Sequence, residues 1–134
     1  MSPGAESPVG AAMSILVIED EPSVTAFLRA ALERKGYTVT PAATGAEGLQ
    51  LLQEGDFLGV ITDIRTPGSV NGADVHSWIQ QNRPQLRSRI ILISGDTANS
   101  ETMALLERSG TPCVEKPFRV QQFISIVERT FGKP

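Results

Sequence analysis

The stretch SILVIEDEP, residues 14–22, sets a run of apolar side chains directly before three acidic ones. Ser14–Ile18 is almost wholly apolar and rich in β-branched residues, which is typical of a parallel strand covered on both faces. Glu19, Asp20 and Glu21 follow at the carboxyl end of that expected strand. Ligands of doubly wound α/β folds bind outside the carboxyl ends of the strands. This stretch therefore predicts both an α/β fold and the edge at which its chemistry takes place.

The same alternation of a short apolar run and an amphipathic stretch continues to the end of the sequence. Further strands are expected at Tyr37–Ala42, Gly59–Asp63, Ile90–Ile93 and Cys113–Glu115. Helices are expected around Ser23–Lys35, Gly45–Gln53, Ala73–Gln81, Ser100–Ser109 and Phe118–Phe131. Five strands, each followed by a helix, predict a parallel sheet with helices on both faces.

Apolar residues at helical spacing predict which faces of the helices point inward. In the first helix these residues are Val24, Phe27, Leu28, Ala31 and Leu32, and in the last they are Val120, Phe123, Ile124, Val127 and Phe131. His76 and Trp78 share the third helix, where we expect a surface or packing role for the histidine and partial burial of the tryptophan.

Length and composition predict one domain, which we place at residues 13–134. The chain has 134 residues, and residues 1–12 are rich in Pro, Gly, Ala and Ser, a composition that predicts a flexible tail. Its formal net charge of −3 gives no reason to expect nucleic acid or a membrane surface as partner. No apolar stretch approaches bilayer-spanning length. The single cysteine excludes an internal disulfide, so we expect a reducing, cytoplasmic location.

Polar side chains stand at the carboxyl ends of four of the five expected strands. Besides the acidic trio, Asp63 ends the third strand, Ser94 follows the fourth and Lys116 follows the fifth. Carboxylates brought this close repel one another and favour a cation, and oxygen ligands with open positions suit Mg²⁺. A lysine and a hydroxyl beside the ion are suited to the oxygens of a phosphoryl group. Asp63 is the expected nucleophile, because its strand is central.

Each of these features also has an ordinary structural explanation when taken alone. An acidic trio stabilises a helix N-terminus, and the Ser94-Gly95 and Lys116-Pro117 pairs are common in turns. Their joint placement at successive strand ends is what favours a functional site.

Four motifs together resemble the receiver domain of two-component response regulators. They are ILVIEDEP (15–22), ITDIRTPG (61–68), ILISG (91–95) and VEKPF (114–118), and the resemblance extends over residues 14–131. It implies a flavodoxin-like (βα)5 fold with strand order 2-1-3-4-5. It also implies that Asp63 is the phosphoacceptor, supplied by a phosphohistidine on a sensor histidine kinase or a histidine phosphotransfer protein.

The resemblance further implies a magnesium site and a switch. Glu19 and Asp20 match the acidic pair that holds Mg²⁺ together with the phosphoacceptor, and the backbone carbonyl of Arg65 matches a further protein ligand. Ser94 matches the switch hydroxyl that turns toward the phosphoryl group. Lys116 matches the lysine that pairs with that group, and the Lys116-Pro117 bond is expected to be cis.

Three features depart from the usual family pattern. The loop Thr66–Gly72 is one residue longer than usual, and Cys113 stands where many regulators carry an aromatic switch residue. Arg65 and Asp96 occupy positions that flank the route of the hydrolytic water in the family. We hypothesise that these two side chains modulate the lifetime of the phosphoryl group, and an exposed ion pair without catalytic effect is the alternative.

The expected function is that of a phosphoacceptor that assists its own phosphorylation and dephosphorylation and is not an enzyme in the ordinary sense. Its output would pass to a downstream protein target through helix 4, strand 5 and helix 5, the surface on which a homodimer would also form. A magnesium-dependent phosphatase is disfavoured, because Arg65 stands where such enzymes need a carboxylic acid. A nucleotide or flavin module is disfavoured by the acidic trio. A receiver used only as an unphosphorylated interaction module is the third alternative.

Overall fold

The five strands form one parallel sheet in the predicted order. The computed structural model describes residues 14–66, 68–95 and 100–133, so the predicted flexible tail lies outside the described residues. The strands are β1 (Ser14–Ile18), β2 (Thr38–Ala42), β3 (Gly59–Asp63), β4 (Ile90–Ser94) and β5 (Cys113–Glu115), arranged β2-β1-β3-β4-β5. β3 therefore lies in the centre of the sheet. The predicted flavodoxin-like order 2-1-3-4-5 is confirmed.

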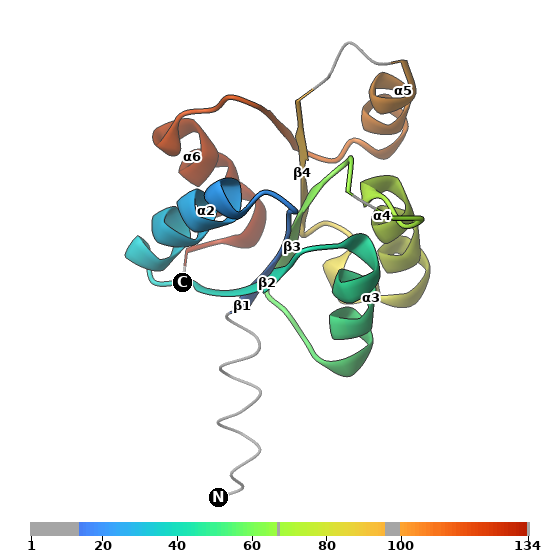
Figure 1. The fold of residues 1–134 in the computed structure, drawn as a ribbon, viewed down its shortest axis with the longest axis horizontal. Helices are drawn as coiled ribbons and strands as arrows, with labels where there is room; N and C mark the ends of the chain where they lie inside the picture. Colours follow the sequence, from blue (N-terminus) through green and yellow to red (C-terminus); the bar gives the residue numbers. More distant parts are fainter. Residues whose placement is uncertain (1–13, 67, 96–99, 134) are drawn as a thin grey trace, which may run out of the picture.

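Helices cover both faces of the sheet (Figure 1). α2 (Pro22–Arg34) and α6 (Val120–Phe131) pack on one face, and α3 (Gly45–Glu54), α4 (Gly72–Asn82) and α5 (Ser100–Ser109) pack on the other. A short 3-10 turn, η2 (Pro84–Leu86), precedes β4. Each face buries its own apolar cluster against the strands, as expected for strands covered on both sides. None of the helices that the structure describes is long and apolar enough to cross a bilayer.

Polar side chains cap the N-termini of two helices, as their residue types indicate. The Thr44 hydroxyl accepts the backbone N–H of Glu47 at 3.1 Å and caps α3. Asn71 and Asp74 form a reciprocal capping box at the start of α4. The predicted helix and strand bounds agree with the observed ones to within two residues.

Two side chains predicted to face the core are instead partly exposed. Phe27 of α2 is 39% exposed and Val120 of α6 is 45% exposed. The apolar face of a helix can be wider than the surface that neighbouring elements cover, which leaves residues at its border exposed. Val120 is also the first residue of its helix. Phe27 packs edge-on against Phe118, with ring centroids 5.7 Å apart.

The amino end of the sheet is closed by contacts to the end of α6. The Tyr37 hydroxyl donates to the carbonyl of Gly132, and the Arg89 guanidinium donates to the carbonyl of Phe131 at 3.0 Å. The Phe131 ring lies directly over Gly59, where a Cβ atom would collide with it. The C-terminal helix is therefore tied to the start of β3 by packing and hydrogen bonds.

Each edge of the sheet has a feature that limits pairing with a further strand. β2 forms one edge, and its residue Pro41, paired with Val17, has no backbone N–H to donate. β5 forms the other edge and has three residues.

Candidate functional site

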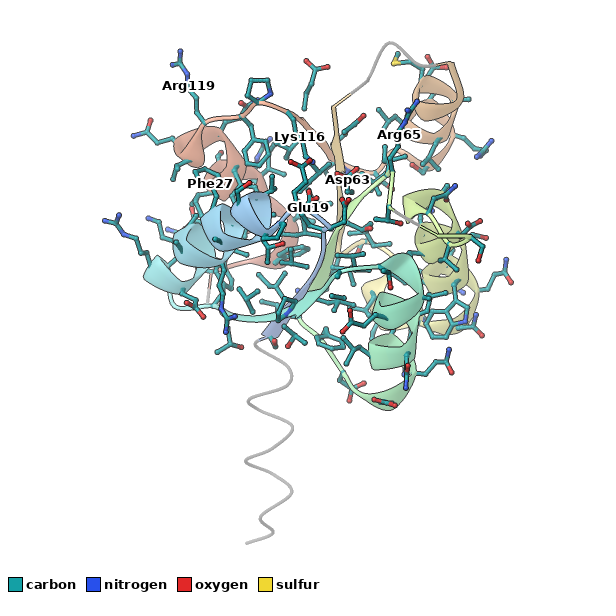
Figure 2. All side chains as sticks on the ribbon, viewed as in Figure 1. Glu19, Phe27, Asp63, Arg65, Lys116 and Arg119 are labelled. Carbon is teal, nitrogen blue, oxygen red and sulfur yellow. The ribbon has the colours of Figure 1, made fainter. Side chains whose placement is uncertain are left out.

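The carboxyl edge of the sheet gathers the side chains that the sequence placed there. Asp63 is the last residue of β3, and Ser94 is the last residue of β4. Glu19 directly follows β1 and Lys116 directly follows β5. Figure 2 shows Glu19, Asp63 and Lys116 converging above the strand ends, between α2 and the segment that leads to α6. Four distant chain segments therefore meet at one site, as predicted.

Three carboxylates form a compact acidic cluster at this edge. Glu19, Asp20 and Asp63 each offer an oxygen, and these oxygens lie within 4.8 Å of one another. Glu19 is 2% exposed and Asp63 is 6% exposed, whereas Asp20 faces solvent. Buried like charges at this separation are unfavourable unless a cation neutralises them. The donor set, made only of oxygen, fits a hard divalent ion that keeps some of its water ligands.

Glu19 has one satisfied carboxylate oxygen and one that is incompletely satisfied. Its Oε2 accepts the backbone N–H of Glu21 at 3.0 Å. Its Oε1 lies 2.9 Å from Lys116 Nζ, yet among the described residues this buried oxygen accepts no hydrogen bond of favourable geometry. Burial raises the pKa of the Glu19 carboxyl above its usual value, although the Glu21 amide and Lys116 oppose that shift. Oε1 is therefore available to a further positive partner.

Both carboxylate oxygens of Asp63 are oriented by hydrogen bonds. Oδ1 accepts the backbone N–H of Arg65 at 2.9 Å, and Oδ2 accepts Lys116 Nζ at 2.7 Å. The chain must return close to this position at the start of α4. A Cβ on Gly72 would lie 2.5 Å from the Asp63 carbonyl oxygen, so only glycine fits there without displacement of the backbone.

Lys116 is the cation at the centre of the site. Its ammonium lies 2.7 Å from Asp63 Oδ2, 2.9 Å from Glu19 Oε1 and 3.6 Å from Glu21 Oε1. Partial burial lowers the pKa of Lys116, but the interactions with the carboxylates of Asp63 and Glu19 outweigh this effect and raise that pKa above its usual range. Its backbone N–H donates to the Ser94 carbonyl at 2.7 Å, and the Lys116-Pro117 bond is cis, as predicted. Lys116 is thus positioned by main chain and side chain alike.

The remaining predicted residues occupy the surroundings of this centre. Ser94 is buried, at 4% exposure, and Arg65 lies on the side of Asp63 away from Lys116 (Figure 2). Asp96 lies outside the described residues, so the hypothesis of an Arg65–Asp96 pair stays a prediction. Cys113 is half-buried in β5. Burial, assisted by Glu115 and Asp63, raises the pKa of its thiol to about 11, so the thiol is protonated at neutral pH.

The long loop after β3 is held by an internal hydrogen bond and by packing against α3. The Thr66 hydroxyl donates to the Val70 carbonyl at 2.7 Å. Val70 in turn lies against Gly45, where a Cβ atom would collide with the Val70 carbonyl. Sequence reasoning noted the extra residue of this loop but not this closure. It also missed Glu21 as a partner of Lys116, although Glu21 belongs to the same acidic trio.

A comparison with protein families decides the assignment. Residues 15–128 match the model of the response regulator receiver domain. This chain belongs to the response regulator receiver family. The predicted membership is thereby confirmed.

Curated relatives of this receiver domain are regulatory proteins. The transcriptional regulatory protein TcrA of Mycobacterium tuberculosis is 29% identical over 111 residues, which are 83% of this chain and 43% of that protein. The transcriptional regulatory protein KdpE of the same species is 33% identical over 83% of this chain and 47% of that protein. The DNA-binding transcriptional regulator NtrC of a Bradyrhizobium strain is 31% identical over 90% of this chain and 25% of that protein.

The chain thus spans less than half the length of these curated relatives. Their names include DNA-binding regulators, so the comparisons do not support the expectation that nucleic acid plays no part.

Solved structures share the fold of this receiver domain. A response regulator receiver domain protein from Methanospirillum hungatei superposes with a TM-score of 0.79 at 24% identity, covering 88% of this chain and 92% of that chain. The receiver domain of a sensor histidine kinase from Pseudomonas aeruginosa superposes with a TM-score of 0.78 at 24% identity, covering 90% and 98% of the two chains. That structure has a magnesium ion coordinated in its active-site cleft.

Proposed function

We propose that this receiver domain accepts a phosphoryl group on the Asp63 carboxylate. The donor is a phosphohistidine on a sensor histidine kinase or a histidine phosphotransfer protein. The observation that carries the proposal is the placement of Asp63, with Oδ2 at 2.7 Å from Lys116 Nζ and two further carboxylates beside it at the strand ends. The family membership supports the same role.

The transfer exchanges one bond to phosphorus for another. A carboxylate oxygen of Asp63 attacks the phosphorus in line, the bond between phosphorus and the donor imidazole nitrogen breaks, and that nitrogen keeps the electron pair. Lys116 offsets the negative charge of the transferred group. The Ser94 hydroxyl, at the end of the neighbouring strand, binds a phosphoryl oxygen. The hydrogen bond from Arg65 to Asp63 Oδ1 holds the carboxylate in a fixed orientation during the attack.

The residues present fit a magnesium ion at this site. Glu19, Asp20 and Asp63 would hold it, together with the backbone carbonyl of Arg65. The incompletely satisfied, buried Oε1 of Glu19 supports this assignment, because a buried carboxylate oxygen without a full partner is costly. When bound, the ion neutralises charge on the acidic cluster and on the phosphoryl oxygens.

The phosphoryl group would change the surface formed by α5, β5 and α6. Binding of a phosphoryl oxygen by Ser94 draws in the segment that follows β4, and a covalent charge biases this element between two states. The Lys116 amide that donates to the Ser94 carbonyl links that movement to the end of β5. We infer that the downstream protein target, or a second copy of the chain, reads this surface. Arg65, Asp96 and Cys113 are the candidates for modulating the lifetime and the coupling.

The test is covalent modification by a small phosphodonor. Incubation with acetyl phosphate and Mg²⁺ should add the mass of one phosphoryl group to the intact protein. Asp63→Asn should abolish the addition, and Asp20→Asn should reduce it strongly, since it removes a carboxylate from the acidic cluster. Asp56→Asn is the matched control, because Asp56 is an exposed aspartate in the segment that precedes β3, at the opposite end of the sheet. Persistence of the modification in Asp63→Asn would overturn the proposal.

A further inference from the structure

Lys116 has a third carboxylate partner that the proposed chemistry does not use. Glu21 Oε1 lies 3.6 Å from Lys116 Nζ, within ion-pair distance but beyond that of a hydrogen bond. Glu19 and Asp63 lie closer to the ammonium and belong to the acidic cluster, whereas Glu21 does not. The Glu21 side chain is 60% exposed, so it faces solvent on one side and the ammonium on the other.

The place of Glu21 in the chain leaves its side chain available for this contact. Glu21 is the N-cap residue of α2, yet its side chain makes no capping hydrogen bond. The shorter side chains preferred at an N-cap, such as that of aspartate, would ordinarily accept a backbone N–H of the first helical turn. Here its backbone N–H instead orients Glu19 by donating to Oε2. The main chain of Glu21 therefore serves the acidic cluster, and its side chain is within reach of the ammonium.

We propose that Glu21 is a positioning residue for Lys116. As the third carboxylate beside the ammonium, it reduces the positive charge that Lys116 can offer to the incoming phosphoryl group. This inference rests on the proposed function of the site. Glu21 also adds a negative charge at the rim of the acidic cluster. The same carboxylate thus attracts a divalent cation and disfavours the phosphoryl oxygens.

These two electrostatic effects have opposite signs, which separates them from a loss of structure. Removing the Glu21 charge should weaken the binding of Mg²⁺ and strengthen the binding of a phosphoryl analogue. A substitution that merely loosened the start of α2 would weaken both. Because the Glu21 side chain is largely exposed, we expect effects of about two- to fivefold at low salt.

The experiment compares Glu21→Gln with the wild-type chain. Titration calorimetry first measures the affinity for Mg²⁺ alone. It then measures, at saturating Mg²⁺, the affinity for beryllofluoride, which is an anionic mimic of the phosphoryl group. The initial rate of phosphorylation by acetyl phosphate is followed by intact mass. Glu33→Gln is the matched control, because it removes the same charge near the other end of α2. Glu33 pairs with Arg29 at 3.1 Å. Both variants retain the length of the side chain.

Glu21→Gln should bind Mg²⁺ about two- to fivefold more weakly and beryllofluoride about two- to fivefold more tightly, with a faster reaction with acetyl phosphate. Raising the salt to about 0.5 M should shrink each difference, whereas Glu33→Gln should match the wild type. Equal affinities in Glu21→Gln and wild type, or weakening of both ligands, would overturn the inference. A wild-type chain that binds neither ligand and takes no phosphoryl group would instead overturn the proposed function itself.

Discussion

The two ends of the sheet satisfy their polar groups in different ways. At the amino end, Tyr37 and Arg89 each donate to a backbone carbonyl at the end of α6, and the Leu58 N–H donates to the Ser14 carbonyl at 2.8 Å. At the carboxyl end, the buried carboxylates of Glu19 and Asp63 share the ammonium of Lys116. The first arrangement matches donors and acceptors, and the second leaves an excess of negative charge.

This difference separates stability from ligand binding within one small domain. Contacts at the amino end lower the free energy of the folded state whether or not a ligand is present. Crowded negative charges at the carboxyl end are unfavourable until a cation neutralises them. Substitutions at the amino end should therefore alter stability alone, and substitutions at the carboxyl end should alter the response to ligands.

The largest expected effect is at the amino end. Phe131→Ala should lower the free energy of unfolding by about 3–5 kcal/mol, because the ring is buried and lies over Gly59. Urea unfolding measures this loss. Phe131→Leu keeps much of the apolar volume and should cost distinctly less. If the Mg²⁺ affinity of the folded Phe131→Leu variant fell as well, the two ends would not be independent.

The second prediction concerns the carboxyl end. Mg²⁺ at about a hundred times its dissociation constant should raise the free energy of unfolding by about 2.7 kcal/mol. Asp20→Asn should lose most of this gain at the same concentration, since it removes an exposed member of the acidic cluster. Unfolding curves with and without Mg²⁺ provide the measurement. An equal gain in both proteins would mean that the ion binds elsewhere.

A smaller effect is expected from the hydrogen bond of Tyr37. Tyr37→Phe removes the donor to the Gly132 carbonyl while keeping the buried ring, and should destabilise the fold by about 1 kcal/mol. Chemical unfolding detects a change of this size. The rate of phosphorylation by acetyl phosphate should stay at the wild-type value, and a change in that rate would contradict the separation of the two ends.

The smallest effect is a pH dependence of stability that arises from His76. His76 is buried on α4, and its Nε2 lies 2.9 Å from the Thr111 hydroxyl. Burial, assisted by the positive charge of Arg108, lowers the pKa of this imidazole. The unfolded chain therefore takes up a proton before the folded one, and stability falls as the pH drops through about 6.5.

His76→Gln has no such titration. The variant should be less stable than the wild type at pH 8, and this difference should shrink toward pH 5. A difference that stays constant with pH would show that His76 contributes nothing to the pH dependence of folding.

Sequence periodicity was sufficient to predict a parallel sheet covered on both faces and the edge at which the polar residues meet, whereas the strand order was predicted from the resemblance to receiver domains. A nearly continuous apolar strand such as Ile90–Ser94 is typical of a parallel sheet covered on both faces, and parallel strands bring their carboxyl ends together. Asp63 and Lys116 were therefore predictable as neighbours although 53 residues separate them. His76 was expected at the surface or in helix packing, and it is buried against Thr111.

The features that the sequence did not predict depend on side-chain direction and local closure. The periodicity of the last helix places Val120 on the inner face. It does not show that Val120, as the first residue of α6, is left exposed by the neighbouring elements. The contact of Glu21 with Lys116 depends on the side chain turning away from the helix that it precedes. The Thr66–Val70 bond depends on how the extra loop residue is accommodated.

The two margins of the sheet have a consequence for solubility. Exposed strand margins can recruit other chains into a growing, intermolecular sheet. Pro41 interrupts the donor row along one margin, and the three residues of β5 offer little length for such a partner along the other. Both margins therefore offer little to an added strand, and we expect the protein to have little tendency to assemble into fibres at high concentration.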